Sequence, residues 1–134
     1  MADKDKRGAV IALDLGTSSF KCGSFDTEMR QIAYSVEDVA LQEEGGSCEL
    51  DFASCLKVAL DTLASAVEQT VDAGCRPEAI VISSQAQTFA PVDRACKPLQ
   101  KGISWLDRRA EAEAAVLREA LPGFSRTTGL YEPG

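Results

Sequence analysis

An uninterrupted apolar run near the start of the chain is the feature that most constrains its fold. Residues 9–13 read AVIAL and are followed at once by Asp14. An apolar run without polar alternation is typical of a strand that is buried on both faces. The turn GTSS begins two residues later, and residues 20–25 then predict a second strand. Because the link is so short, the two strands are expected to pair antiparallel.

The apolar period changes twice further along. Residues 32–36 alternate as a third strand, which completes an antiparallel meander, and residues 43–47 predict a polar loop. A helix follows, with Asp51 as its N-cap and Gly74 as its stop. Its expected inward face is formed by Phe52, Leu56, Leu60, Leu63, Val67 and Val71. Residues 79–82 then predict another buried strand, so that strand, helix and strand form a right-handed crossover.

The last third of the sequence is less regular. Residues 88–92 and 103–105 are expected to form a hairpin or an extension of the sheet. A second helix is expected from about residue 107 to residue 121. Its inward side chains are expected to be Ala110, Ala114, Leu117 and Leu121. This order of elements is that of an α/β, ribonuclease-H-like domain, with a mixed sheet built from a three-strand meander and helix-strand units.

Composition restricts the partners and the compartment. The chain has 134 residues, about one domain, and its net charge of −7 argues against nucleic acid and anionic membranes as partners. Five cysteines without a CxxC pair, and no histidine, favour reduced thiols over a zinc site or disulfides. The run at 9–13 is too short for a signal sequence or a membrane span. A cytoplasmic protein is expected, with residues 1–8 as a disordered tail.

The turn after the first strand, DLGTSSFK, has the residue types of a phosphate-binding loop. Asp14 can hold water around a magnesium ion, and Gly16 lets the backbone approach a phosphate closely. Thr17 and Ser18 bring hydroxyl and N–H groups that form an anion-binding nest. Lys21 can add a positive charge near the terminal phosphate. The alternative is an ordinary polar hairpin turn, because the same residues are common in turns.

Two segments resemble motifs of the FGGY family of carbohydrate kinases. IALDLGTSSFK is similar to the family's first phosphate motif, Asp-x-Gly-Thr-Ser/Thr-Ser-x-Lys/Arg after a hydrophobic strand. ISSQAQTFAPVDRACKPLQKGISWLDRRA is similar to its sugar-side stretch, a Ser-x-Gln strand end, a turn with Asp and Pro, and Ile-x-Trp-x-Asp-x-Arg. The segments occur in the family's order and at about its spacing, and the resemblance spans residues 9–129.

The resemblance implies the fold of the actin and heat-shock ATPases, with ATP and Mg²⁺ as cofactors. It places Asp14 on the metal side, through water, and Gly16, Thr17 and Ser18 at the ATP phosphates, with Lys21 as a weaker assignment. On the sugar side it implies a site for a small sugar or polyol. The substrate-binding residues implied there are Gln85, Ala86, Gln87, Trp105 and Asp107.

These sugar-side residues have suitable chemistry. Trp105 offers an apolar face for a sugar ring, Asp107 accepts hydroxyl protons, and the amides of Gln85 and Gln87 can donate or accept. The alternatives are Trp105 as plain core and Asp107 as N-cap of the following helix. In the family, glycerol kinases carry Arg-Glu and xylulose kinases Met-His where this chain has Ala86-Gln87, so glycerol and D-xylulose are disfavoured as substrates.

Family members are far longer than this chain. Their catalytic aspartate would lie beyond Gly134, and their second phosphate loop and adenosine pocket belong to a second domain. We therefore expect residues 9–134 to be the first part of a kinase that transfers the γ-phosphoryl group of MgATP to a sugar hydroxyl, inactive alone. It is expected to form a homodimer or to associate with the remainder of the kinase. The alternatives are a non-catalytic sugar- or nucleotide-binding module and an actin- or heat-shock-type ATPase.

Overall fold

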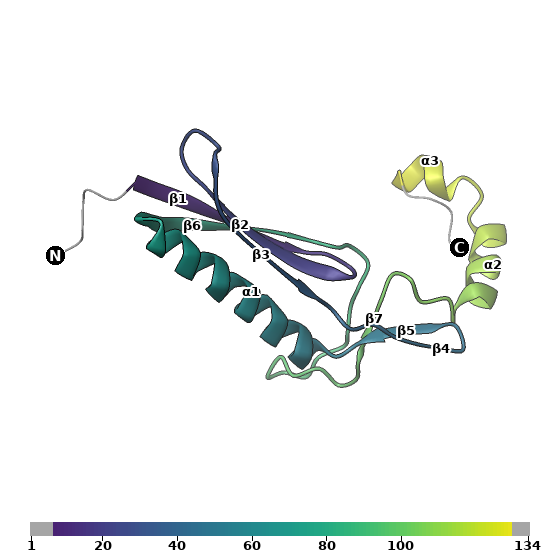
Figure 1. Ribbon diagram of the computed structural model, residues 1–134. Coiled ribbons are helices and arrows are strands. Elements are labelled where there is room, and N and C mark those ends of the chain that lie inside the picture. The colour runs from purple at the N-terminus through teal and green to yellow at the C-terminus, as the bar shows by residue number, and fades with distance from the viewer. Residues whose placement is uncertain (1–6, 130–134) are drawn as a thin grey trace. The chain divides into compact units, whose positions relative to one another are not determined.

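The computed structural model describes residues 7–129 and divides the chain into two compact units (Figure 1). Unit 1 comprises Met1–Leu41 and Asp51–Gln87, and unit 2 comprises Gln42–Leu50 and Thr88–Gly134. Within the described part of the chain, no helix is long and apolar enough to cross a membrane.

Unit 1 is built on a four-stranded mixed sheet. Its strands are β1 (Arg7–Leu15), β2 (Ser19–Phe25), β3 (Gln31–Asp38) and β6 (Cys75–Ser84), in the order β3-β2-β1-β6. β1, β2 and β3 form the predicted antiparallel meander, and β6 pairs parallel to β1. Of the tail predicted for residues 1–8, residues 1–6 lie outside the described residues, and Arg7 and Gly8 are part of β1.

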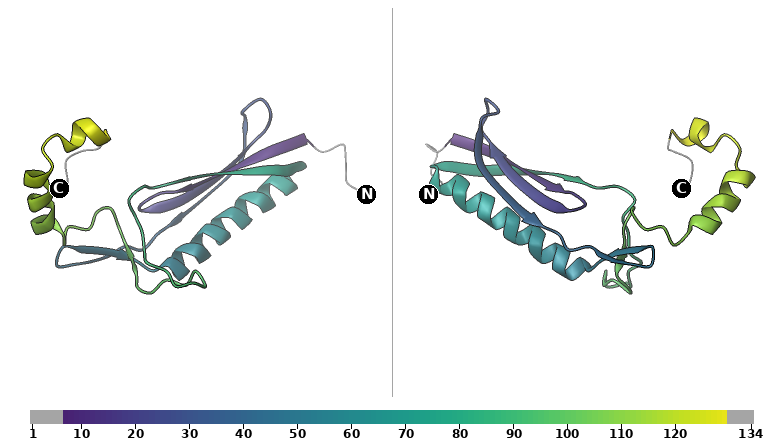
Figure 2. Two further views of the ribbon diagram at one scale, coloured as in Figure 1. Left: turned by 180° about the vertical axis from the view of Figure 1, so that it is seen from behind. Right: turned by 45° about the vertical axis from the view of Figure 1, so that its right-hand side comes forward.

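One long helix, α1 (Phe52–Asp72), packs along one face of this sheet, as all three views in Figures 1 and 2 show. The Asp51 carboxylate accepts from the Ser54 N–H at 2.7 Å, which confirms the predicted N-cap. Gly74 follows the helix with φ +72°, in the left-handed region that favours glycine. α1 therefore begins and ends where its capping residues predict.

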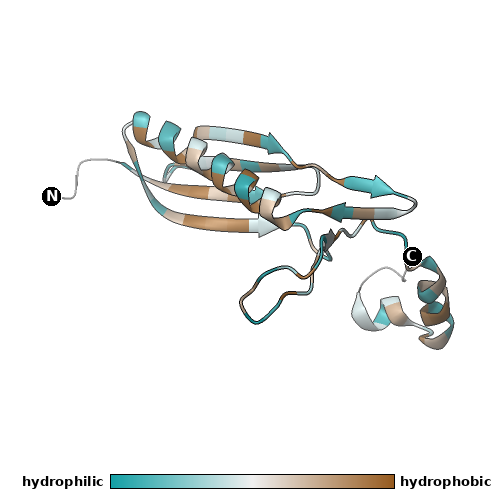
Figure 3. Cartoon of the chain, turned by 90° about the horizontal axis from the view of Figure 1, so that it is seen from below, coloured by the Kyte–Doolittle hydropathy of each residue, from teal (hydrophilic) through white to brown (hydrophobic). Residues whose placement is uncertain are grey.

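The face that α1 buries differs from the predicted one. Its buried residues are Cys55, Thr62, Ala66 and Thr70. Leu63 and Val67 pack against the core cluster as predicted, but Leu56 and Leu60 are 61% and 55% exposed. The buried threonines donate to main-chain carbonyls one turn back, so small polar residues fit against the sheet. Figure 3 shows the resulting alternation of hydrophilic and hydrophobic residues along α1.

The core of unit 1 lies between β1, β2 and α1. Ile11, Leu13, Cys22 and Ala66 form a buried cluster there. Each large apolar side chain that is fully buried in this way contributes about 1.5–3 kcal/mol to stability. β6 was predicted to be buried, but within the described chain it is an edge strand, and its Ile82 is 66% exposed.

Unit 2 contains a small antiparallel sheet that the sequence did not predict in full. β4 (Gln42–Glu44) and β5 (Ser47–Leu50) form a hairpin, and β7 (Gly102–Ile103) pairs with β5. The predicted loop at 43–47 is therefore wrong except at the turn itself, where Gly45 and Gly46 have φ +56° and +90°. Two consecutive positive φ values fit a tight hairpin turn, which glycine adopts without strain.

The predicted hairpin at 88–92 and 103–105 is reduced to a single bridge. Phe89 and Ile103 exchange backbone hydrogen bonds at 3.1 and 2.8 Å. The second helix, α2 (Glu111–Ala120), begins four residues later than predicted, and a short helix, α3 (Phe124–Thr128), follows it. Of the inward residues predicted for α2, only Ala114 is buried.

Candidate functional site

The turn between β1 and β2 brings the predicted phosphate-loop residues together. Asp14, on β1, is the cross-strand partner of Lys21 on β2. The Lys21 Nζ donates to Ser19 Oγ at 2.7 Å. Gly16 and Ser18 lie between the two strands, so their N–H groups do not belong to the β1–β2 ladder. A carboxylate and an ammonium group thus stand on the two strands that enter and leave this turn.

Gly16 is required by the geometry of the turn. A Cβ added at this residue would lie 2.8 Å from the Ser19 carbonyl oxygen, 3.9 Å from Asp14 Oδ2 and 3.9 Å from Lys21 Nζ. The first distance is too short, and the obstacle is backbone that cannot swing away. Any residue with a side chain would therefore force this turn to shift, so its backbone conformation depends on glycine.

The end of β6 meets the same turn. Because β1 and β6 are parallel, their carboxyl ends lie at one edge of the sheet, and Leu15 pairs with Ser84. The next residue, Gln85, donates its backbone N–H to the Leu15 carbonyl at 2.9 Å. Thr17 Oγ1 donates to Gln85 Oε1 at 3.0 Å. A residue predicted for the sugar side thus contacts the predicted phosphate loop.

Trp105 lies in a turn formed by residues 104–107, here called the Trp105 turn, in which the Asp107 N–H donates to the Ser104 carbonyl at 3.0 Å. Backbone contacts within unit 2 hold this turn in place. The Ser104 N–H donates to the Cys48 carbonyl on β5 at 2.9 Å, and Ser104 is buried. The Trp105 N–H donates to Thr88 Oγ1 at 3.3 Å. Trp105 itself is 51% exposed, which contradicts the alternative that it is plain core.

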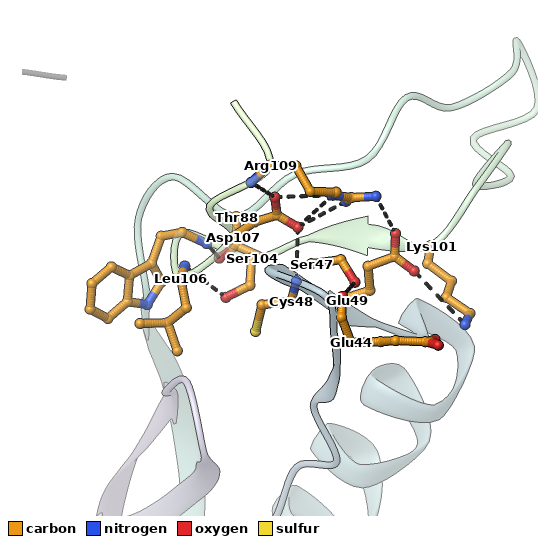
Figure 4. A network of polar contacts seen from close by, with 11 residues as sticks. Glu44, Ser47, Cys48, Glu49, Thr88, Lys101, Ser104, Leu106, Asp107 and Arg109 are labelled. Atoms are coloured by element: carbon orange, nitrogen blue, oxygen red, sulfur yellow. Dashed lines mark hydrogen bonds and ion pairs between the residues drawn. The ribbon is translucent and has the colours of Figure 1, made fainter. Parts of the chain in front are cut away.

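Asp107 is the centre of a polar network in unit 2 (Figure 4). Its Oδ2 accepts from the Cys48 N–H at 2.8 Å and lies 2.8 Å from an Arg109 guanidinium nitrogen. Its Oδ1 accepts from the Arg109 backbone N–H at 3.0 Å and from Arg109 Nε at 3.1 Å. Arg109 also bonds Glu49 at 2.9 Å, and Lys101 lies 3.8 Å from the other Glu49 oxygen.

These contacts lower the pKa of Asp107 to about 2. The Arg109 guanidinium contributes most, followed by the Cys48 N–H, because both stabilise the carboxylate form. In turn, Asp107 raises the pKa of Arg109 above its usual value. The carboxylate is therefore ionised throughout the ordinary pH range, and its side chain is only 7% exposed.

The comparison with protein families decides the assignment. Residues 9–131 match the model of the N-terminal domain of the FGGY family of carbohydrate kinases. The chain belongs to this family. The family assignment and the α/β, actin-like fold expected from the sequence are thereby confirmed.

Individual FGGY relatives support the same conclusion. The glycerol kinase of Delftia acidovorans is 34% identical over 125 residues, which are 90% of this chain and 25% of the relative. The structure of xylulose kinase from Rhodospirillum rubrum has a TM-score of 0.78 at 24% identity and covers 86% of this chain and 24% of its own. Plasmodium falciparum glycerol kinase with ADP has a TM-score of 0.79 at 20% identity, over 95% of this chain and 26% of its own. The chain spans about a quarter of the length of the relatives it matches.

Within this FGGY domain the sugar-side predictions divide into two groups. Gln85 lies with the phosphate loop, and Ala86 and Gln87 follow it in unit 1, both exposed. Trp105 and Asp107 lie in unit 2. Asp107 is not the N-cap of α2, because that position is Ala110, which makes no side-chain capping bond.

Sequence reasoning missed two residues of the Asp107 network. Arg109 stands in the Trp-x-Asp-x-Arg motif and carried a signal, since an arginine two residues after an aspartate can form a bidentate pair with it. Glu49 carried none, because nothing in a sequence pattern places a strand residue near a distant arginine. The contact between Glu49 and Arg109 therefore depends on the position of β5, which the sequence did not predict.

Proposed function

We propose that the protein to which this chain belongs is an ATP-dependent carbohydrate kinase, and that this chain supplies one phosphate loop and part of the sugar side. The observation that carries the proposal is the Gly16 turn. It leaves no room for a Cβ and lies between a carboxylate on β1 and an ammonium group on β2. Membership of the FGGY family supports the same activity.

The residues of this turn suit a magnesium-bound nucleotide. Asp14 is exposed and would hold the metal through water, as carboxylates commonly do for Mg²⁺. The N–H groups of Gly16 and Ser18 would donate to phosphate oxygens, and Lys21 would offset phosphate charge. MgATP, when bound, supplies the γ-phosphoryl group that is transferred. The turn contributes by orienting the phosphates, which is the main task of the protein in phosphoryl transfer.

The sugar side is proposed to present Trp105 to the substrate. Its half-exposed indole offers an apolar face to a sugar ring. Each Asp107 oxygen already accepts two N–H groups, so we propose that this carboxylate supports the Trp105 turn. Ala86 and Gln87, on the turn after β6, are proposed to contact the sugar.

The substrate class is a sugar or polyol. Relatives named glycerol kinase make glycerol the first compound to test. The Ala86-Gln87 pair argues for another compound, because it differs from the Arg-Glu pair expected of glycerol kinases. Ala86 adds no charge and little bulk, so it leaves space beside the β6 end for an uncharged substrate group.

The test uses the longest form of the protein that the gene encodes. ADP release is measured with MgATP and each compound of a panel of polyols, aldoses and ketoses. Control reactions omit either MgATP or the sugar or polyol. The proposal expects ADP release that depends on one or a few of these compounds. Calorimetric titration of the same compounds follows in parallel. Sugar binding without sugar-dependent ADP release would overturn the proposed kinase function. It would support the alternative of a non-catalytic binding module.

A further inference from the structure

Gln85 links two motifs that the sequence assigns to different substrates. It follows the last residue of β6, and its backbone N–H bonds to Leu15, at the end of β1. The side chain continues in the same direction and reaches Thr17 and Gly16, in the turn proposed to bind phosphates. Gln85 therefore makes three hydrogen bonds to residues 15–17, and these bonds connect the end of β6 to the start of the turn.

Hydrogen-bond chemistry fixes the orientation of the Gln85 amide. The Gly16 carbonyl can only accept, so the amide nitrogen must face it, at 3.4 Å. The amide oxygen then faces Thr17 Oγ1, at 3.0 Å. A reversed amide would place two oxygens against each other at Gly16. Thr17 must therefore be the donor in its bond to Gln85.

This orientation limits what the Thr17 hydroxyl can do. A hydroxyl has a single proton, and that of Thr17 is directed at Gln85 Oε1. Phosphate oxygens only accept, so Thr17 cannot donate to them while this bond persists. The donors that this turn can offer to phosphates are then its backbone N–H groups, the Ser18 hydroxyl and Lys21. The direction of the N–H groups depends on the conformation that Gln85 holds.

We infer that Gln85 is a positioning residue of the phosphate loop, which fixes Thr17 and Gly16 for the nucleotide, and that it does not read sugar hydroxyls. This inference rests on the proposed kinase function. It assigns Gln85 to the nucleotide side, whereas the sequence resemblance assigns it to the sugar side.

Gln87 provides a matched comparison. It has the same side chain two residues further along and is exposed, and its backbone is in the left-handed region at φ +62°. No hydrogen bond of its side chain to another described residue is found, whereas Gln85 bonds to two residues of the turn. The two glutamines thus separate a loop-positioning role from a sugar-contacting role.

The kinetic test compares Gln85→Met, Thr17→Val and the double variant in the longest form of the protein. Methionine keeps the length of glutamine without its hydrogen bonds, and valine keeps the shape of threonine. Each single variant is expected to raise the KM for ATP about five- to tenfold, as loss of a partly buried hydrogen bond does. The KM for the sugar should stay within about twofold. The double variant should be no worse than Gln85→Met alone, because both substitutions remove the Thr17–Gln85 bond and Gln85→Met also removes the bond to Gly16.

A contrary result is equally clear. An increase in the sugar KM in Gln85→Met, with the ATP KM unchanged, would overturn the inference and return Gln85 to the sugar side. Full additivity of Gln85→Met and Thr17→Val would also overturn it.

A second measurement does not depend on kinase activity. Amide hydrogen exchange over residues 14–19 is compared between the parent protein, Gln85→Met and Gln87→Met. Exchange is expected to be about five- to tenfold faster in Gln85→Met and unchanged in Gln87→Met. Equal exchange in all three would overturn the inference even in an active kinase. Faster exchange in a protein that phosphorylates nothing would leave the Gln85 contact established and remove the proposed kinase function instead.

Discussion

The two candidate regions of this chain are built by different means. In unit 1, strand pairing assembles the site: β1 and β6 are parallel neighbours, so Thr17 and Gln85 meet although they are 68 positions apart in the sequence. In unit 2, charged side chains hold the Trp105 turn, through Asp107, Arg109 and Glu49. The difference suggests that backbone changes should damage the first region and charge changes the second.

The largest effect is expected at the carboxylate of the unit 1 turn. Asp14→Ala should lower kcat by about two to three orders of magnitude, because positioning of the metal is lost. The kcat is measured from the rate of ADP release by the longest form of the protein. Asp61→Ala is the control, since Asp61 is exposed on α1 and pairs with Lys57 in its own helix. Near-normal turnover of Asp14→Ala would show that this turn is not the metal side.

Backbone sensitivity is tested next, at Gly16. In Gly16→Ala the new methyl group would lie 2.8 Å from the Ser19 carbonyl, so the turn must shift. We expect the KM for ATP to rise at least about tenfold and stability to fall by about 1–3 kcal/mol, as for other overpacked sites. Kinetics and thermal unfolding measure the two effects.

Gly8→Ala is the matched control, near the start of β1, the strand that leads into the Gly16 turn. The three atoms nearest to its methyl group would all belong to the Glu78 side chain, which can swing away into solvent. It should leave the KM for ATP unchanged. Equal effects of the two substitutions would mean that the Gly16 turn has no special need for a bare backbone.

These differences also explain how far the sequence could predict the structure. The meander, α1 and β6 were predictable, because apolar runs and caps report backbone structure directly. The meeting of residues 14–18 with Gln85 was not, because it depends on the register of β6 against β1 to within one residue. The Gly45-Gly46 hairpin had a turn signal, but its first strand, β4, is acidic and exposed and lacks the apolar alternation that identifies strands. Its second strand, β5, does alternate, with Cys48 and Leu50 buried, but it is only four residues long.

Charge sensitivity is tested in unit 2. Asp107→Ala removes the group that holds Arg109 and the Cys48 N–H, so the Trp105 turn should loosen. We expect the KM for the sugar to rise about three- to tenfold while the KM for ATP stays the same, as for loss of a charge-assisted contact. Fluorescence of Trp105, the only tryptophan, should report sugar binding directly in a titration.

Asp93→Ala is the control for this experiment. Asp93 also accepts backbone N–H groups in an exposed turn of unit 2, but its partners are Ala95 and Lys97. Sugar affinity should not change in this variant. If Asp107→Ala left both the fluorescence response and the sugar affinity as in the parent, the Trp105 turn would not be part of the sugar side.

The smallest expected effect concerns acid stability, and it compares one carboxylate from each unit. Asp26 in unit 1 has its pKa lowered by the backbone N–H and then the guanidinium of Arg30, and Asp107 has its pKa lowered to about 2. Since each pKa is lower in the folded state, each carboxylate contributes stability above its unfolded pKa of 3.8, and this is lost as the pH falls through the folded value. For Asp107 the loss should therefore occur between about pH 4 and about pH 2.

Trp105 fluorescence during acid titration reports unit 2, because Trp105 lies there. Asp107→Asn cannot lose a charge in this range, so it should be less stable than the parent at neutral pH and should show a weaker dependence on pH between about 4 and 2. Asp26→Asn, which removes the matching carboxylate from unit 1, should leave the fluorescence transition close to that of the parent, because the two carboxylates share no partner. An unchanged acid transition in Asp107→Asn, or an equal shift in both variants, would mean that the polar network does not set the acid stability of unit 2. The contrast between a region assembled by strand pairing and one held by charge would then fail for unit 2.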